Sequence, residues 1–468
     1  MKNLNPMKKF AIILFSVLTI TSCSNDDDDS TIEFEPTNSI VELAQATPEL
    51  SSLVTALVKY PDLVDLLSGN GTYTVFAPNN TAFADLLGAI GQTSIDDIPE
   101  DVLKSVLQHH VFASAALEAS DVTSGTITMA GGETVDVVAD SNGVFIDSAQ
   151  VIAVDGLATN GVVHVINSVL VPPSMLPIVG TIVAPAYFNK NFTTLIEAVL
   201  AADPSILELL LSNGPGDSGL TLFAPTNDAF TAAGITDLAD VADIVDTVLA
   251  YHVVDGTIMQ SMLPDSGIAA AEVSTLGGNI YITNAGGAVS INGTTMVTAT
   301  DITGSNGVVH VIDRTLIPPT NTINDIVASL AGGNPAEFTM LAAALAQAGL
   351  GDTFGTAGPF TVFAPTDAAF MDAGFANVDA INATDASVLV AILTHHVVEP
   401  SVYIFSTDLT DDLQAPMLNG QNVTIDLDTL TIQDAAGSTP AGLVTSLLNV
   451  HATNGVVHVI DKVLLPSN

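Results

Sequence analysis

Apolar and polar positions follow the same order three times along this chain. Each cycle opens with a segment in which apolar residues recur at three- and four-residue steps, the spacing of one face of a helix. These segments begin at Leu50, Phe192 and Phe338. A short apolar run follows each of them, and a β-branched run, typical of a buried strand, closes each cycle. The pattern predicts an α+β fold that is built three times.

The predicted strands carry motifs that recur almost unchanged. One motif reads TVFAPNNTAF, TLFAPTNDAF and TVFAPTDAAF, starting at Thr74, Thr221 and Thr361. The other, NGVVHVI, is identical at residues 160–166, 306–312 and 454–460. Successive copies of the first threonine lie 147 and 140 residues apart, which is the size of a domain rather than of a solenoid repeat. Each copy can therefore bury its own core.

The distance between the two motifs differs among the copies. It is 86, 85 and 93 residues, so the third copy carries extra residues, which we place within 403–420. Double prolines at 172–173 and 318–319 favour stiff, extended connections between the copies. We place the domains at residues 38–173, 178–319 and 321–467.

Two sets of side chains recur within these motifs and are candidates for function or structure. A Tyr-His pair precedes a short strand, with its histidine at His110, His252 and His396 and its tyrosine present only as Tyr251. The NGVVHVI strands contribute His164, His310 and His458. After the proline of the first motif, Asn79, Asn227 and Asp367 are expected to cap a helix. They are also plausible hydrogen-bond partners for the Tyr-His histidines.

The two motifs and the Tyr-His pair, in this order and spacing, resemble the fasciclin domain over residues 38–466. The resemblance implies a compact wedge of antiparallel strands packed with several helices, and a role in extracellular adhesion. It also implies binding at the Tyr-His segments, so we take His110, Tyr251, His252 and His396 as candidate binding residues. Two departures are that His109 and His395 replace the tyrosine, and that Asn167 replaces the aspartate found at Asp313 and Asp461.

The N-terminus resembles a lipoprotein export signal. Three lysines precede an apolar stretch of eleven residues, 10–20, which is too short to span a bilayer. The stretch ends in Ile-Thr-Ser-Cys, where Cys23 is the only cysteine of the chain. We expect residues 1–22 to be removed, Cys23 to carry the lipid, and residues 23–37 to form an acidic linker. The run Asp26–Asp29 is a solvated spacer or a signal for export to the outer face of the outer membrane, and the two are compatible.

The charge excludes one class of partner. Without residues 1–22 the chain holds five basic side chains against 51 acidic ones, a formal charge of −46. Nucleic-acid binding requires a basic face and is therefore excluded as a hypothesis. The membrane is expected to be a partner only through the lipid at Cys23.

The recurring histidines are expected to be structural. No ligand spacing such as HExxH is present, and no serine nucleophile recurs beside the histidines, so we predict no metal site, no catalytic residue and no cofactor. A buried neutral imidazole is satisfied by a carbonyl on one nitrogen and a side-chain oxygen on the other. We expect His164, His310 and His458 to be held in this way.

Three functions remain open. The first is a lipid-anchored adhesion protein that faces outward from the outer membrane and contacts an extracellular polysaccharide, matrix or partner-cell protein. The second is a glycan-acting hydrolase, and the third is a purely structural envelope lipoprotein. Three copies favour the first function, because weak sites on one chain gain avidity. The sequence does not indicate the oligomeric state or the ligand.

Overall fold

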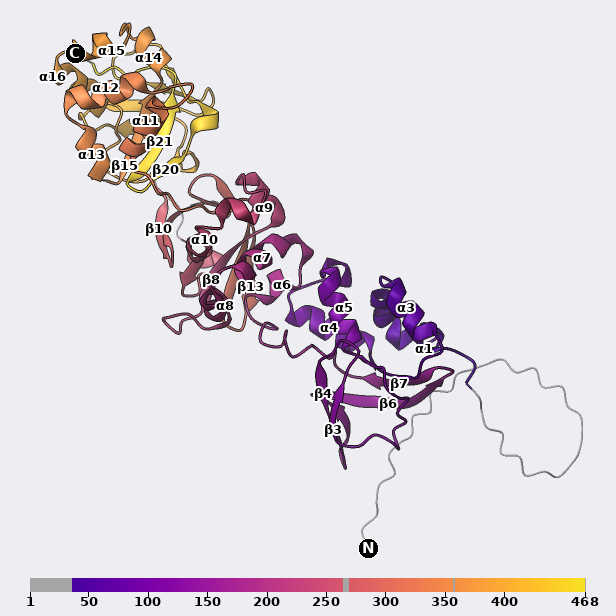
Figure 1. The fold of residues 1–468 in the computed structure, drawn as a ribbon. Coiled ribbons are helices and arrows are strands. Elements are labelled where there is room, and N and C mark those ends of the chain that lie inside the picture. Colours follow the sequence, from indigo (N-terminus) through magenta and orange to yellow (C-terminus); the bar gives the residue numbers. More distant parts are fainter. Residues whose placement is uncertain (1–35, 264–268, 357, 468) are drawn as a thin grey trace, which may run out of the picture. The chain divides into compact units, whose positions relative to one another are not determined.

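The computed structural model describes residues 36–263, 269–356 and 358–467 (Figure 1). Cys23 and the acidic run after it lie outside the described residues. The chain divides into two compact units, of which the first contains the first repeat and the second contains the other two. Among the described residues, no helix has both the length and the apolar character that crossing a bilayer requires.

The first repeat packs helices against one mixed sheet, and its sequence-predicted helix at Leu50 is present as α2. The strand order is β2-β1-β7-β6-β5-β4-β3. The helices are α1 (Ile40–Gln45), α2 (Ser51–Leu57), α3 (Pro61–Ser68), α4 (Asn80–Ala89) and α5 (Glu100–Gln108). The strands are β1 (Tyr73–Pro78), β2 (Val111–Phe112), β3 (Gly125–Thr128), β4 (Thr134–Asp140), β5 (Gly143–Ile146), β6 (Ala149–Ala158) and β7 (Gly161–Ile166).

The second repeat has the same sheet, in the order β10-β11-β12-β13-β14-β8-β9. Its helices are α6 (Ala184–Tyr187), α7 (Thr193–Ala201), α8 (Pro204–Leu211), α9 (Asn227–Ala232) and α10 (Val245–Tyr251). Its strands are β8 (Leu220–Pro225), β9 (Val253–Asp255), β10 (Ala271–Thr275), β11 (Gly278–Ala285), β12 (Ala288–Ile291), β13 (Thr295–Gly304) and β14 (Gly307–Ile312).

The third repeat divides its strands between two sheets, β15-β21-β20 and β16-β17-β18-β19. Its helices are α11 (Ile323–Ala331), α12 (Thr339–Ala348), α13 (Gly351–Thr356), α14 (Asp367–Asp372), α15 (Val378–Asn382) and α16 (Ala386–Thr394). Its strands are β15 (Phe360–Pro365), β16 (Leu413–Pro416), β17 (Asn422–Asp426), β18 (Thr431–Gln433), β19 (Ala441–Gly442), β20 (Val450–Ala452) and β21 (Gly455–Ile460).

The sequence predicts the extra residues of the third repeat within 403–420, but the structure places them elsewhere. From β15 to β17 the third repeat matches the length of the first from β1 to β4, whereas the stretch from β18 to β21 is longer than that from β5 to β7. The insertion therefore lies between residues 434 and 449. Most of it lies in the connection between β18 and β19, and the strand that is continuous as β6 in the first repeat is divided into β19 and β20.

The two recurring motifs meet as a parallel strand pair at the centre of each repeat. β1 pairs with β7, β8 with β14 and β15 with β21, all in parallel. The α+β prediction is confirmed, but the expected antiparallel sheet is in fact mixed because of this pair. The glycine of NGVVHVI permits the close approach: a Cβ on Gly307, at a φ of +151°, would lie 2.0 Å from the carbonyl oxygen of Leu220. This steric requirement explains why the glycine is present in all three copies of the motif.

The asparagine of NGVVHVI joins the last strand to the helices at the start of its repeat. In the first repeat, Asn160 accepts from the Ile40 N–H (2.9 Å) and donates to the carbonyl oxygens of Leu67 (2.8 Å) and Gly69 (3.0 Å). Asn306 and Asn454 make the equivalent contacts with Ile182 and Ile323. The motif therefore joins the last strand of each domain to its first helices, and the recurring asparagine has a structural role.

We expect Asn160→Asp to destabilise the first repeat by about 2–3 kcal/mol, because a carboxylate cannot donate to the two buried carbonyls that the amide holds. Asn70→Asp adds the same charge at an exposed position in the same repeat and is the matched control. Urea denaturation curves of both variants measure the difference. Equal midpoints for the two variants would show that the amide bonds contribute nothing.

Candidate functional site

The histidines of the Tyr-His pairs are hydrogen-bonded in the same way in all three repeats. In the second, the Leu316 N–H donates to Nε2 of His252 (2.9 Å), so Nδ1 carries the proton and donates to the Val248 carbonyl (2.6 Å). His110 bonds Val106 and Leu170 in this way, and His396 bonds Ile392 and Leu464. Each ring thus joins the end of a helix to the backbone that follows the last strand, with both nitrogens used.

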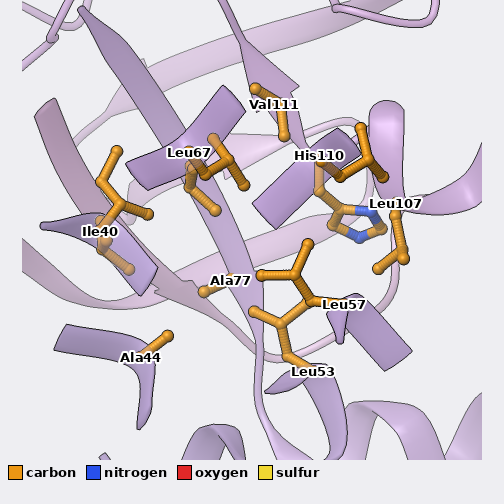
Figure 2. A pocket seen from close by; sticks show the side chains of 12 residues that line it. Ile40, Ala44, Leu53, Leu57, Leu67, Ala77, Leu107, His110 and Val111 are labelled. Atoms are coloured by element: carbon orange, nitrogen blue, oxygen red, sulfur yellow. The ribbon is translucent and has the colours of Figure 1, made fainter. Parts of the chain in front are cut away.

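These rings face the interior of their domains. Figure 2 shows the His110 ring beside Leu57 and Leu107, at the wall of an apolar cavity. The cavity is about 30 Å³, which is the space of about one water molecule and far below that of a ligand site. His396 lines an equivalent cavity of about 20 Å³ in the third repeat. The histidines proposed for binding therefore lie in the core and present no surface.

The histidines of the NGVVHVI strands are also satisfied by the backbone. His164 donates through Nε2 to the Leu117 carbonyl (2.7 Å), and its Nδ1 faces the Asp155 N–H at 3.4 Å. His310 and His458 bond the carbonyls of Ile258 and Ile404. The expectation of a carbonyl on one nitrogen is confirmed, but the second partner is a backbone N–H and not a side-chain oxygen. Each ring also lies against a phenylalanine of the neighbouring parallel strand, at 5.5–5.9 Å between centroids.

Burial favours the neutral imidazole at five of these histidines. It lowers the pKa of His110, His252, His396 and His458 to about 4, and it also lowers the pKa of His164. A neutral ring with both nitrogens bonded has no free lone pair for a metal and no free nitrogen to accept a proton from a substrate. Within the described residues, no group of three or more His, Cys, Asp or Glu side chains is placed to hold a metal ion.

The polar residues after the proline cap helices and do not contact the histidines. Asn79 accepts from the Ala82 N–H (2.8 Å) at the start of its own helix, α4. Asn227 and Asp367 lie one position further along their motifs and cap the upstream helices, at the N–H groups of Thr194 and Met340. Thr226 and Thr366 are the true equivalents of Asn79. The expected pairing of these residues with the histidines is wrong, because backbone groups already occupy both ring nitrogens.

The tyrosine position of the pair differs among the repeats. Tyr251 is buried and donates to the Asn279 carbonyl (2.8 Å), and burial raises its pKa to about 12. His109 occupies the same position in the first repeat, and neither of its nitrogens has a hydrogen-bond partner among the described residues. His395 in the third repeat bonds Asn419 (3.1 Å) through Nδ1 only. Histidine is therefore a poorer fit than tyrosine at this buried position.

The second and third repeats pack against each other within their common unit. The rings of Tyr281 and Tyr403 stack at 3.9 Å between centroids, and Phe405 completes the apolar cluster. Beside it, the Thr283 hydroxyl donates to the Asp408 carboxylate, whose pKa is raised by burial. Sequence reasoning missed this contact, because its tyrosines recur in no other copy and the double proline indicated only a stiff connection.

A cleft of about 200 Å³ opens beside this contact, and sequence reasoning missed it too. Both repeats contribute to its walls. Its polar lining is Asn292, Thr294, Thr295, Arg314 and Thr315 from the second repeat and Asn449 and His451 from the third. Arg314 is the only arginine of the chain, and that was the one available signal. Sites between domains are common positions for ligands.

Comparisons with known proteins agree with the threefold pattern. The model of the fasciclin domain matches residues 48–172, 190–318 and 336–466. The transforming growth factor-beta-induced protein ig-h3 of Sus scrofa is 28% identical over 92% of this chain, which covers 58% of that protein. Periostin of Homo sapiens is 30% identical over 74% of this chain, which covers 39% of it. The chain thus spans little more than half of ig-h3 and less than half of periostin.

Smaller relatives and a solved structure also match. Protein sll1483 of Synechocystis is 39% identical over 29% of this chain, which covers 73% of that protein. Among solved structures, a FAS1 domain pair from the insect cell adhesion molecule Fasciclin I is 17% identical, with a TM-score of 0.28 over 59% of this chain and 97% of that one.

Proposed function

Because the chain belongs to the fasciclin domain family, we propose that it is a binding protein in which three domains make multivalent contact with an extracellular polysaccharide, matrix or partner-cell protein. The observation that carries the proposal is that the motif histidines, the NGVVHVI asparagines and the helix-capping residues all make their hydrogen bonds inside their own domains. The motifs maintain three folded domains and leave their surfaces free to differ. Three weak sites on one chain reach high avidity when their geometry allows simultaneous contact.

The proposal places the protein at the outer membrane, held by a lipid on Cys23 and facing outward. The basic residues, the short apolar stretch and the Ile-Thr-Ser-Cys run support this anchor. Each buried methylene of an acyl chain contributes about 0.8 kcal/mol, so two or three chains hold a protein stably at a membrane. The acidic residues behind the anchor serve as a spacer that keeps the domains clear of the lipid.

Binding of the soluble segment 30–468 to immobilised polysaccharides and surface proteins tests the proposal. We expect slower dissociation from a densely coated surface than from a sparse one, because multivalent contact requires neighbouring ligands. In whole cells, Cys23→Ser should remove the protein from the surface without affecting binding by the soluble segment. The adhesion proposal fails if no surface polymer or protein is bound. Dissociation that is independent of coating density would contradict multivalency.

A further inference from the structure

One wall of the cleft is formed by the second repeat, and three residues near this wall differ from the equivalent residues of the other two repeats. Arg314 corresponds to Ser168 in the first repeat and to Lys462 in the third. Lys462 pairs with Asp372 (3.0 Å), but the second repeat has Ala232 where that aspartate lies. The ion pair of the third repeat is therefore missing here, and the exposed Arg314 lines the cleft instead.

Thr315 places an unsatisfied polar group at the same wall. Its equivalents are Val169 and Val463, both buried and apolar. Thr315 is 3% exposed, and its hydroxyl has no hydrogen-bond partner in the part of the chain that the structure describes. Exchanging a buried valine for a threonine of the same shape costs free energy unless the hydroxyl is bonded. The second repeat thus carries a cost that the other two avoid, at a position beside its only arginine.

The third repeat completes the cleft with an imidazole that lies outside every recurring motif. His451 stands edge-on to the rings of Tyr281, Tyr403 and Phe405, at 5.6–5.7 Å between centroids. No hydrogen bond from its ring is present among the described residues. Asn449 beside it donates to the Gly293 carbonyl (2.9 Å) and to the Ser406 hydroxyl (2.7 Å). The cleft therefore contains one imidazole whose nitrogens are available for hydrogen bonds.

We propose that this cleft binds a carboxylate carried on a compact polar ring, as in a uronic acid residue of an acidic polysaccharide. The guanidinium of Arg314 matches a carboxylate in a planar, two-bond arrangement. The Thr315 hydroxyl and the His451 ring supply polar contacts for the rest of the residue. The inference deepens the proposed function and rests on it, since it names the ligand class of one contact.

Size and charge favour this class of ligand. A volume of about 200 Å³ is below the 300–1,000 Å³ typical of sites that enclose drug-sized ligands, so it suits a single sugar ring whose chain continues into solvent. One arginine balances one negative charge, which suits a carboxylate better than a phosphate dianion. The acidic surface of the protein repels polyanions, but screening limits this repulsion to about 8 Å at physiological ionic strength.

Calorimetric titration of the soluble segment 30–468 with an oligogalacturonate in 0.15 M NaCl tests the site. We expect binding of the oligogalacturonate, weakening by at least tenfold in Arg314→Gln, and weakening by a few-fold in Thr315→Val. Thr315→Val restores the residue of the other repeats and should fold normally. Lys462→Gln removes the same charge at the equivalent position of the third repeat and is the matched control, expected to bind within twofold of the unmodified chain.

Each other result overturns the inference in a distinguishable way. Equal weakening by Lys462→Gln would assign the effect to general charge. Equal binding of a neutral glucose oligosaccharide would exclude the carboxylate as the recognised group, and tighter binding of a sulfated oligosaccharide would replace it. Absence of oligogalacturonate binding, with binding to another surface polymer or protein, would overturn this site and leave the proposed function standing.

Discussion

Lowering the pH from 7.5 to 5 is expected to unfold the third repeat before the other two. The reason is that buried histidines must remain neutral in the folded chain but take up protons once they are exposed. Burial lowers the pKa of His396, His458 and His451, all in the third repeat, to about 4. In each of the other repeats one histidine reaches this value, His110 in the first and His252 in the second.

The direction of the effect follows from the sign of these shifts. A histidine in the unfolded chain has a pKa of about 6.5, so between pH 6.5 and 4 the unfolded state binds more protons than the folded state. The contribution of these neutral histidines to stability is therefore fully present above about pH 6.5 and is lost as the pH falls towards 4. One pKa unit corresponds to about 1.4 kcal/mol, so each such histidine lowers the free energy of unfolding by about 2 kcal/mol at pH 5.

Three such histidines in the third repeat lower its free energy of unfolding by about 6 kcal/mol at pH 5, against about 2 kcal/mol from the one such histidine in each of the others. Burial also lowers the pKa of His109 and His164 in the first repeat and of His395 in the third, and these three add to the losses of their own repeats. A typical domain is stable by only 5–15 kcal/mol, so the third repeat loses much or all of its stability. Protonation of the 51 acidic side chains relieves repulsion, but mainly below about pH 4.5, because carboxyl groups have pKa values near 4. Histidine protonation therefore dominates between pH 6.5 and 5.

Differential scanning calorimetry at pH 7.5, 6 and 5 measures the loss, and hydrogen exchange assigns it to a repeat. His451→Gln is the informative variant, because this ring makes no hydrogen bond among the described residues and its removal deletes one of the three titrations. The variant should recover about a third of the acid-linked loss of the third repeat. A melting temperature that stays constant or rises between pH 7.5 and 5 would contradict the explanation.

The spacing of apolar residues along the chain predicted the secondary structure, because a helix or strand depends mainly on residues close in sequence. The three-residue and four-residue spacing located α2, α7 and α12, and the β-branched runs located β7, β14 and β21. The partners of the histidines could not be predicted in this way, because they are backbone groups distant in sequence: His110 receives its bond from Leu170, 60 residues away. The sequence shows that a side chain recurs, but it does not show which of many carbonyl and N–H groups the fold brings to it.

The departures among the repeats were harder to interpret than their agreement. Asn227 and Asp367 resemble Asn79 in chemistry, but Thr226 and Thr366 occupy its position in the fold. The extra residues of the third repeat lie in a segment that has no recurring motif, so the sequence does not locate them. The junction of the second and third repeats depends on Tyr281 and Tyr403, which have no counterparts elsewhere in the chain. A repeat pattern predicts what the copies share, which is the core. Sites that only one copy carries require the structure.

The Tyr-His histidine of the second repeat provides the sharpest test of this division between core and surface. His252→Ala is expected to destabilise the second repeat by about 3–5 kcal/mol. The substitution leaves a cavity in a fully buried site and removes the partners of the Val248 carbonyl and the Leu316 N–H, both of which the ring satisfies. The effect should appear as a lower melting temperature and a lower urea midpoint.

Ser290→Ala is the matched control within the same repeat. Ser290 is also buried, but its hydroxyl has no hydrogen-bond partner among the described residues, so its removal should not destabilise the repeat and should raise its free energy of unfolding by about 1 kcal/mol. Ligand binding, measured at a temperature where both variants remain folded, should match that of the unmodified chain, because His252 presents no surface. If His252→Ala kept its melting temperature but lost binding, His252 would belong to a binding site, and the assignment of the recurring histidines to the core would be wrong.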